Sequence, residues 1–201
     1  MDIKFPMSMS ILGSCGAGKT VLCKYIISYF EDKFDFVFVI TSTGFNGQYD
    51  FLDTLSLKNK VMNTIDFDKK IAFIMKKQKA YIDSGIKPSI LIVFDDVMGS
   101  IKTSKKIKLL ISTFRHYNIN IIFISQYANA ISTELRELCF YSCVFNQFTE
   151  RSLKAVNESY FAHMNFKDFK MFINKKLSKP YTFMFVDRIK KKNSIMKAPN
   201  L

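Results

Sequence analysis

The sequence contains no tryptophan, only two histidines and only four cysteines among its 201 residues. No two of the cysteines form a C-x-x-C pair, and with so few histidines a zinc site is not expected. Reduced thiols in a cytosol-like compartment are the simpler interpretation. The absence of tryptophan beside 21 phenylalanines indicates a base-composition bias of the gene more than a site. The cysteines are Cys15, Cys23, Cys139 and Cys143.

Long apolar runs are also missing. None approaches the roughly 20 residues of a membrane span, and residues 1–6 lack the basic-then-apolar pattern of a signal peptide. We therefore expect a soluble, intracellular protein with no membrane partner.

Acidic residues are scarce as well: Asp and Glu number 17 against 30 Lys and Arg, which gives a formal net charge of +13. This excess favours a polyanionic partner, most simply nucleic acid. A Lys-rich composition in an AT-rich genome would produce the same excess, so charge alone leaves both explanations open.

One stretch fits the phosphate-binding pattern G-x-x-x-x-G-K-[ST]. Its glycines let the backbone curl so that successive N–H groups point at one anion, and a following helix adds its positive end. We expect Lys19 to reach the β- and γ-phosphates of ATP and the Thr20 hydroxyl to ligate Mg²⁺. The residues expected to bind the nucleotide are Gly13, Ser14, Cys15, Gly16, Ala17, Gly18, Lys19 and Thr20.

The surroundings of this motif support it. The pattern needs a strand before it and a helix after it. Residues 7–12 alternate apolar and small polar side chains, as a short strand does, and residues 21–30 carry apolar side chains at helical spacing. This context favours a phosphate-binding loop over a simple glycine-rich turn.

A second motif follows the apolar run 89–94, which suits a central parallel strand. The run ends in two carboxylates, at the strand end where open α/β sheets bind ligands. This is the Walker B pattern, in which Asp95 is expected to hold Mg²⁺ and Asp96 to orient or deprotonate the attacking water.

A third apolar run, residues 119–124, ends in Ser125 and Gln126. A glutamine at such a strand tip is able to hydrogen-bond the γ-phosphate or the attacking water. It is equally able to face solvent, and this strand alone does not decide between the two.

Strands and helices alternate along the chain, which predicts an α/β fold of the P-loop NTPase type (ASCE class), with a mostly parallel sheet covered by helices on both faces. We expect one ATPase domain over residues 1–201, with a loose basic tail from about residue 188. Asp66 and Ser132 are candidate helix caps. The main expected strands are 7–12, 34–40, 89–96, 119–126, 139–145 and 181–187, with a short edge strand at 60–62. The expected helices are 21–30, 68–83, 105–116, 133–138, 150–156 and 166–172.

Together, these motifs resemble the FtsK–HerA superfamily of DNA-pumping ATPases, and within it the viral genome-packaging branch of poxvirus type. The run 114–126 makes the resemblance specific to this branch. In the sequence pattern of the branch, an arginine precedes the strand that carries the γ-phosphate sensor, and that strand ends in Ser/Thr-Gln. Here the arginine is Arg115 and the glutamine is Gln126. The segment 135–153 is also similar. The resemblance covers about residues 7–156, and it departs at Asp96, where the wider superfamily more often has glutamate.

This resemblance implies an ATP-driven translocase of double-stranded DNA, most simply the genome-packaging ATPase of a DNA virus, acting in the host cytoplasm or the virion. ATP and Mg²⁺ would be its cofactors. It implies a homo-oligomeric ring in which a neighbouring subunit supplies an arginine finger, and capsid proteins as further partners. The finger candidates, in order, are Arg115, Arg151 and Arg136. The candidates for DNA contact are Lys102, Lys105 and Lys106.

Two alternatives remain at this stage. Another P-loop enzyme, a helicase or DNA-repair translocase, would use the same site on a different nucleic acid. A nucleotide-binding scaffold that assembles on DNA or capsid would hydrolyse little ATP. The presence of Lys19, Asp95 and Asp96 argues against the scaffold, but only turnover separates it from an enzyme.

Overall fold

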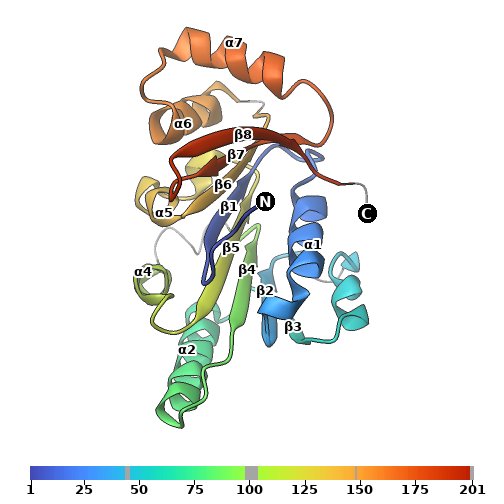
Figure 1. Ribbon diagram of the computed structural model, residues 1–201, viewed down its shortest axis with the longest axis vertical. Coiled ribbons are helices and arrows are strands. Elements are labelled where there is room, and N and C mark those ends of the chain that lie inside the picture. Colours follow the sequence, from blue (N-terminus) through green and yellow to red (C-terminus); the bar gives the residue numbers. More distant parts are fainter. Residues whose placement is uncertain (44–45, 98–103, 148, 200–201) are drawn as a thin grey trace.

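The computed structural model describes residues 1–43, 46–97, 104–147 and 149–199 (Figure 1). An eight-stranded sheet with the order β3-β2-β4-β5-β1-β6-β7-β8 forms its centre. Neighbouring strands from β3 to β6 pair in parallel, whereas β7 pairs antiparallel with both β6 and β8. The strands are β1 (Ser8–Leu12), β2 (Phe36–Thr41), β3 (Lys58–Met62), β4 (Ile90–Asp95), β5 (Ile119–Ser125), β6 (Tyr141–Phe145), β7 (Thr182–Asp187) and β8 (Lys192–Lys197).

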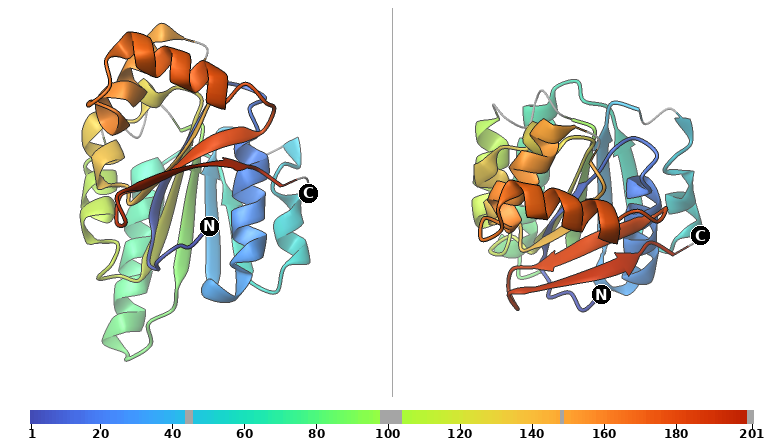
Figure 2. Two further views of the ribbon diagram at one scale, coloured as in Figure 1. Left: turned by 45° about the horizontal axis from the view of Figure 1, so that its top comes forward. Right: turned by 90° about the horizontal axis from the view of Figure 1, so that it is seen from above.

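Helices cover both faces of the sheet, as predicted (Figure 2). Helix α1 packs on one face, with its apolar side chains in one hydrophobic core, and the other helices contribute to a second core on the opposite face. Within the described ranges, no helix combines the length and apolarity needed to cross a bilayer. The helices are α1 (Lys19–Tyr29), α2 (Phe67–Asp83), α4 (Lys105–Thr113), α5 (Thr133–Leu138), α6 (Glu150–Tyr160) and α7 (Phe166–Lys176).

The central strands are buried on both sides, which explains their unbroken apolar runs. Every residue of β4 and β5 is buried. Phe94 lies opposite Phe123 in the register, and the two rings stack with centroids 5.2 Å apart. Such packed strands hold the polar residues that follow them in fixed positions.

The expectation of a loose basic tail was wrong. Residues 192–197 form β8, an edge strand in which Lys192 lies opposite Asp187 and Lys197 opposite Thr182. Most side chains of β8 are exposed, because an edge strand here has little protein above it. Its polar composition therefore resembles that of a disordered segment, and this misled the prediction. The backbone of β8 is nevertheless hydrogen-bonded to β7.

The helix ends show smaller differences. The helix expected over residues 105–116 ends at Thr113. The Ser132 side chain caps α5 as expected, accepting a hydrogen bond from the Leu135 N–H at 3.3 Å. Asp66 precedes α2 but does not cap it with its side chain, which instead pairs with Lys69 at 3.0 Å. Its backbone is left-handed, with φ of 53°, and this conformation takes the carboxylate away from the helix N–H groups.

Candidate active site

Four parallel strands, β4, β5, β1 and β6, end side by side at one edge of the sheet, which we call the carboxyl edge. Residues 13–20 follow β1, Asp95 ends β4 with Asp96 directly after it, and Gln126 follows β5. The register places Leu12 beside Ser125. The structure thus brings together the motifs that the sequence predicts to act on one nucleotide, as expected for the ligand-binding edge of an open α/β sheet.

The phosphate-binding loop, residues 13–20, is tied to both neighbouring strands. Its first N–H, of Gly13, donates to the carbonyl of Ser125, the last residue of β5, at 3.2 Å, and the Ser14 N–H donates to the Asn146 carbonyl just after β6 at 3.3 Å. The Lys19 ammonium folds back onto the loop and donates to the Ser14 carbonyl at 2.9 Å. Cys15 and Gly16 are exposed at the tip of the loop, while Ala17, Gly18, Lys19 and Thr20 are half-buried.

Two positions of the loop require glycine, each for a different physical reason. A Cβ at Gly13 would lie 2.6 Å from the Phe145 Cβ, so β6 leaves no room for a side chain there. Gly18 has φ of +102°, and a Cβ on it would lie 2.5 Å from the ring of Tyr181. The spacing of the motif therefore reflects tight packing on the β6–β7 side as well as the curl of the backbone.

Lys19 is electrostatically coupled to the two carboxylates. Partial burial lowers the pKa of Lys19, and the negative charge of Asp96 is the largest effect opposing that shift. A lysine whose charge is poorly hydrated interacts strongly with an incoming phosphate, because little water has to be removed. The loop therefore has both the backbone donors and the cation that a polyphosphate needs.

Asp95 is nearly buried, with 6% of its surface exposed. Its Oδ2 accepts a 2.7 Å hydrogen bond from the Tyr49 hydroxyl. Burial raises the pKa of Asp95, and the bond from Tyr49 works in the opposite direction. The carboxylate is thus held in one orientation at some cost in folding stability, as is common in sites that bind a cation.

Asp96 is positioned differently. Its backbone is left-handed, with φ of 53°, which turns its side chain toward β5. There Gln126 Nε2 donates to Asp96 Oδ2 at 2.6 Å. Among the described residues, the buried Oδ1 of Asp96 has no hydrogen-bond partner. An unsatisfied carboxylate oxygen beside the phosphate-binding loop fits a role in binding a water or a ligand.

Tyr49 is a site residue that the sequence interpretation missed. It is only 2% exposed and precedes the short 3₁₀ helix Asp50–Thr54. Burial raises the pKa of Tyr49, so its hydroxyl stays protonated and acts as a donor to Asp95. The single signal in the sequence was an aromatic residue in a polar loop, and nothing local indicates that this loop folds back over β4.

The donor set fits Mg²⁺. The Thr20 hydroxyl and the Asp95 carboxylate are hard oxygen donors, and the neighbouring Asp96 Oδ1 is a buried acceptor without a partner among the described residues. Mg²⁺ is commonly bound by one or two carboxylates together with substrate phosphates and water. The residues present therefore suit the ion that the motif implies.

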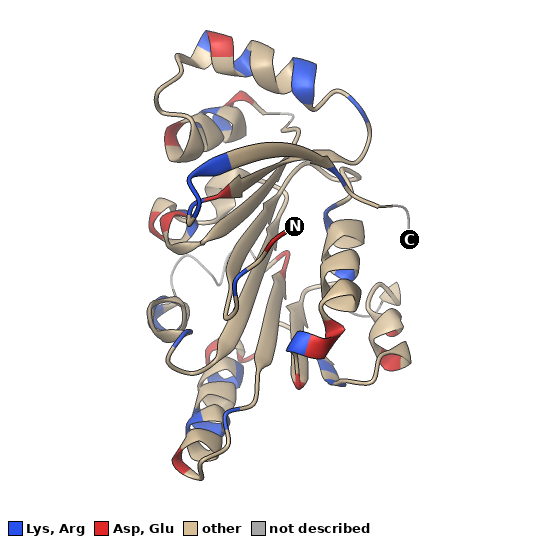
Figure 3. Ribbon diagram, viewed as in Figure 1, with Lys and Arg blue, Asp and Glu red and all other residues tan. Residues whose placement is uncertain are grey.

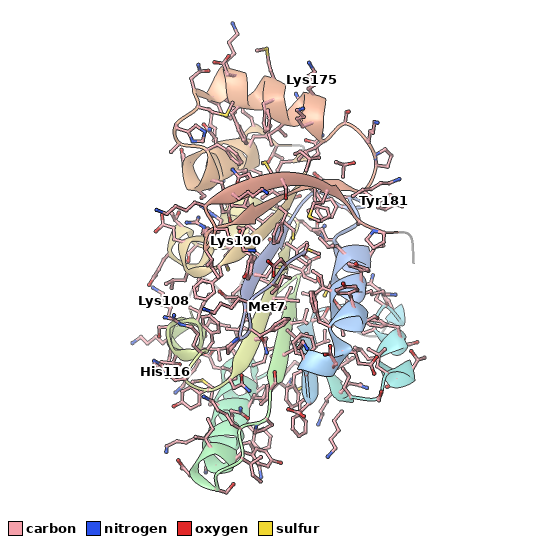
Figure 4. The ribbon with its side chains drawn as sticks, viewed as in Figure 1. Met7, Lys108, His116, Lys175, Tyr181 and Lys190 are labelled. Atoms are coloured by element: carbon pink, nitrogen blue, oxygen red, sulfur yellow. The ribbon has the colours of Figure 1, made fainter. Side chains whose placement is uncertain are left out.

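Arg115 is not near these residues within one chain. It lies between α4 and β5, at the starting ends of the parallel strands and so at the edge opposite the carboxyl edge. Its guanidinium stands 5.4 Å from the centroid of the Phe140 ring, and its side chain is exposed. Figure 4 shows the next residue, His116, well away from Tyr181.

The other two arginine candidates differ sharply. Arg136 is 4% exposed. Its guanidinium donates to the carbonyls of Ala128 and Ile131 and to the hydroxyls of Thr133 and Ser159. It is therefore committed to holding α5 in place, which corrects its candidacy as a finger. Arg151, by contrast, is exposed in the first turn of α6, and α6 follows β6 at the carboxyl edge.

The candidate DNA-contacting lysines fall in the segment after β4. Lys105 and Lys106 are exposed in the first turn of α4. Lys102 lies outside the described residues. Figure 3 shows basic residues spread over several further elements, including α2, α7 and the β7–β8 hairpin, so these two lysines are part of a wider positive charge.

Solved structures share this fold. The genome packaging NTPase B204 of Sulfolobus turreted icosahedral virus 2, in complex with AMPPCP, is 17% identical with a TM-score of 0.75, covering 98% of this chain and 100% of that one. The pCW3 conjugation coupling protein TcpA is 16% identical with a TM-score of 0.70, and the match covers 98% of this chain and 62% of that one. EssC of Geobacillus thermodenitrificans is 13% identical with a TM-score of 0.64, and the match covers 96% of this chain and 39% of that one.

No curated protein matches the sequence. The model of the family described as "Poxvirus A32 protein" matches residues 2–192, which include the phosphate-binding loop, both carboxylates, Gln126 and all strands up to the start of β8. The match spans nearly the whole chain, and the chain therefore belongs to the Poxvirus A32 protein family.

Proposed function

We propose that this protein is an ATPase that drives double-stranded DNA into a viral capsid, acting as one domain over residues 1–201. The observation that carries the proposal is the hydrogen bond from Gln126 to Asp96 beside the phosphate-binding loop. In the proposed mechanism this bond would join the γ-phosphate sensor, Gln126, to the carboxylate that orients water. The structural relative B204 is described as a genome packaging NTPase and was solved with nucleotides, which supports the same class of substrate here.

The proposed chemistry needs little from the protein beyond positioning and charge neutralisation. Backbone N–H groups of residues 13–20 would bind the phosphates, and Lys19 would neutralise charge that develops on the γ-phosphate. Thr20 and Asp95 would hold Mg²⁺, which supplies further charge neutralisation when bound. Asp96 would orient the attacking water and accept its proton, while Gln126 keeps the Asp96 carboxylate in place.

A site open at the carboxyl edge leaves room for a neighbouring subunit. We propose a homo-oligomeric ring in which an arginine reaches the γ-phosphate of the next subunit. Arg151 fits this role best because it is exposed at the carboxyl edge. Arg115 would fit only if the ring places the opposite edge of one subunit against the site of the next.

For DNA, the proposal rests on the net charge of +13 and on Lys105 and Lys106, exposed in the helix that follows Asp96. Lysines that contact phosphates release counterions on binding, so affinity should fall steeply with salt. The position after Walker B also links DNA contact to the state of the nucleotide. Capsid proteins are proposed as further partners.

The first experiment is steady-state ATP hydrolysis with and without double-stranded DNA, for the parent, Lys19→Ala and Asp96→Asn. Strong stimulation by DNA that both substitutions abolish, without strand separation, would support a packaging motor. Strand separation would favour a helicase, hydrolysis indifferent to DNA would favour another P-loop enzyme, and ATP binding without turnover would favour a scaffold.

A matched pair of double variants tests the DNA contact. Replacing Lys105 and Lys106 by alanine removes two charges after Walker B, and replacing Lys76 and Lys77 removes two exposed charges from the middle of α2. The first pair should lower DNA stimulation and reduce the salt dependence of DNA binding, and the second should change both less. Equal effects of the two pairs would contradict a specific contact at α4.

A further inference from the structure

A cavity of about 290 Å³ lies on the outer side of the phosphate-binding loop. It is lined by Ser14 and Ala17 of the loop, by Phe145 and Asn146 at the end of β6, and by the connection between α7 and β7, residues 177–181. Its volume is near the lower limit of small-molecule sites, about 300–1,000 Å³. The chemistry proposed above uses the loop that forms one wall of this cavity, and it gives no role to the side chains of the other walls.

The order of the strands determines which end of a nucleotide faces this cavity. Asp95, Asp96 and Gln126 belong to β4 and β5, on one side of β1, whereas the cavity lies against β6 and β7, on the other side. A triphosphate held after β1 must direct its γ-phosphate toward the carboxylates. Its nucleoside must then extend the opposite way, over β6 and β7, where the cavity opens beside the loop.

An aromatic side chain stands at this place. The Tyr181 ring packs against Gly18, close enough that a Cβ on Gly18 would lie 2.5 Å from it, and 42% of Tyr181 remains exposed. Figure 4 shows Tyr181 beside the end of α1 that follows the loop. The Tyr181 carbonyl accepts a hydrogen bond from the Ala198 N–H at 2.8 Å, just after β8, and its φ is 59°. The ring is thus presented by a constrained backbone.

We infer that this cavity binds the nucleoside of the bound nucleotide, with the Tyr181 ring stacking on the base. The inference rests on the proposed function, because it needs a triphosphate in the loop. Phe145, Ala17 and Leu177 supply apolar surface, while Asn146 and Lys179 offer polar groups to the ribose or the base edge. Stacking on an aromatic face accepts any base, so the site should bind nucleosides with little selectivity among bases.

Binding of ATP and of inorganic tripolyphosphate, each with Mg²⁺, separates the nucleoside from the phosphates. Calorimetry on the full chain should show that Tyr181→Ala weakens ATP binding about tenfold while tripolyphosphate affinity changes little, and that Tyr181→Phe stays close to the parent. The matched control is Tyr81→Ala on α2, since Tyr81 is 40% exposed and remote from the loop. It should change neither affinity.

Because the chain has no tryptophan, Tyr181→Trp places a unique fluorophore in the cavity. Its emission should change on addition of ATP or ADP and should not change with tripolyphosphate. Equal loss of ATP and tripolyphosphate affinity in Tyr181→Ala, or a reporter that responds equally to both probes, would overturn the inference while leaving the proposed ATPase intact. A parent chain that binds neither probe would overturn the proposed function as well.

Discussion

The two sides of β1 serve the same loop in different ways. On the β4–β5 side, Gln126 donates a short hydrogen bond to Asp96, and Tyr49 donates one to the neighbouring Asp95. On the β6–β8 side, Phe145 and Tyr181 approach the glycines of the loop so closely that no side chain would fit. Polar contacts therefore dominate one side and aromatic packing the other.

This difference matches what the two ends of a nucleotide would require if it binds as proposed above. A phosphate undergoing transfer needs oxygen and nitrogen atoms at defined positions, because charge moves during the reaction. A nucleoside needs mainly apolar area and shape. Substitutions on the β4–β5 side should therefore change turnover, and those on the β6–β8 side should change binding or stability.

The largest expected effect is on turnover. Gln126→Ala removes the donor that holds Asp96 Oδ2 at 2.6 Å, and we expect kcat to fall by about 100-fold with ATP affinity nearly unchanged. Tyr181→Ala should show the converse: ATP binding becomes weaker, while kcat stays within a few-fold of the parent value. Kinetics under saturating ATP, together with calorimetric binding, provide the two readouts. If both variants lost affinity and kept kcat, the division between the two sides would fail.

The next effect is on stability. Gly13→Ala would place a Cβ 2.6 Å from Phe145 Cβ, and relieving that overlap should cost about 1–3 kcal/mol of unfolding free energy. Gly16→Ala is the matched control, because no atom lies within 4 Å of its Cβ and only its φ of +74° opposes the substitution. Denaturant unfolding of both variants measures the contrast. A Gly13→Ala variant as stable as the parent would show that packing against β6 does not exclude a side chain.

A smaller effect is expected for Tyr49→Phe. This change keeps the ring in its buried position and removes only the hydroxyl that donates to Asp95. If Asp95 holds the metal ion as proposed, loss of the hydrogen bond behind it should weaken Mg²⁺ or Mn²⁺ affinity by about tenfold. Direct Mn²⁺ binding in the presence of ADP measures this without turnover. Unchanged metal affinity would reduce Tyr49 to a packing residue.

The smallest effect concerns pH and Asp95. Because the folded-state pKa of Asp95 is raised, ionisation opposes folding, and stability falls as pH rises from the ordinary value near 3.8 through the raised value. Asp95→Asn should therefore raise the thermal midpoint by a few degrees at neutral pH without Mg²⁺. The gain should disappear below about pH 4. A gain that is constant with pH would point to a cause other than ionisation.

The β4–β5 side of the site was largely predictable from the sequence. The loop, the two carboxylates and Gln126 follow strands whose apolar runs are unmistakable, and parallel strands bring their ends together without further information. Local sequence patterns therefore predict which residues form the β4–β5 side. What remained open was the geometry, such as the left-handed Asp96 that turns its carboxylate toward Gln126.

Other features could not be read locally. Tyr49 reaches Asp95 across 46 positions of sequence, and no periodicity marks such a contact. The β8 strand has too little buried surface to give an alternating pattern. Arg136 and Arg151 flank one strand and look equivalent in sequence, yet one is buried among four acceptors and the other is exposed. Tertiary packing decides each of these.

The two outer strands of the sheet have one further consequence. Strand β3 exposes Lys58 and Lys60, and β8 exposes Lys192 and Lys197. If a second copy extended the sheet at either edge, these like charges would be brought close together, which discourages such pairing. Crowded copies should therefore resist growing into β-rich aggregates, which favours contacts through helices and loops over pairing of strands.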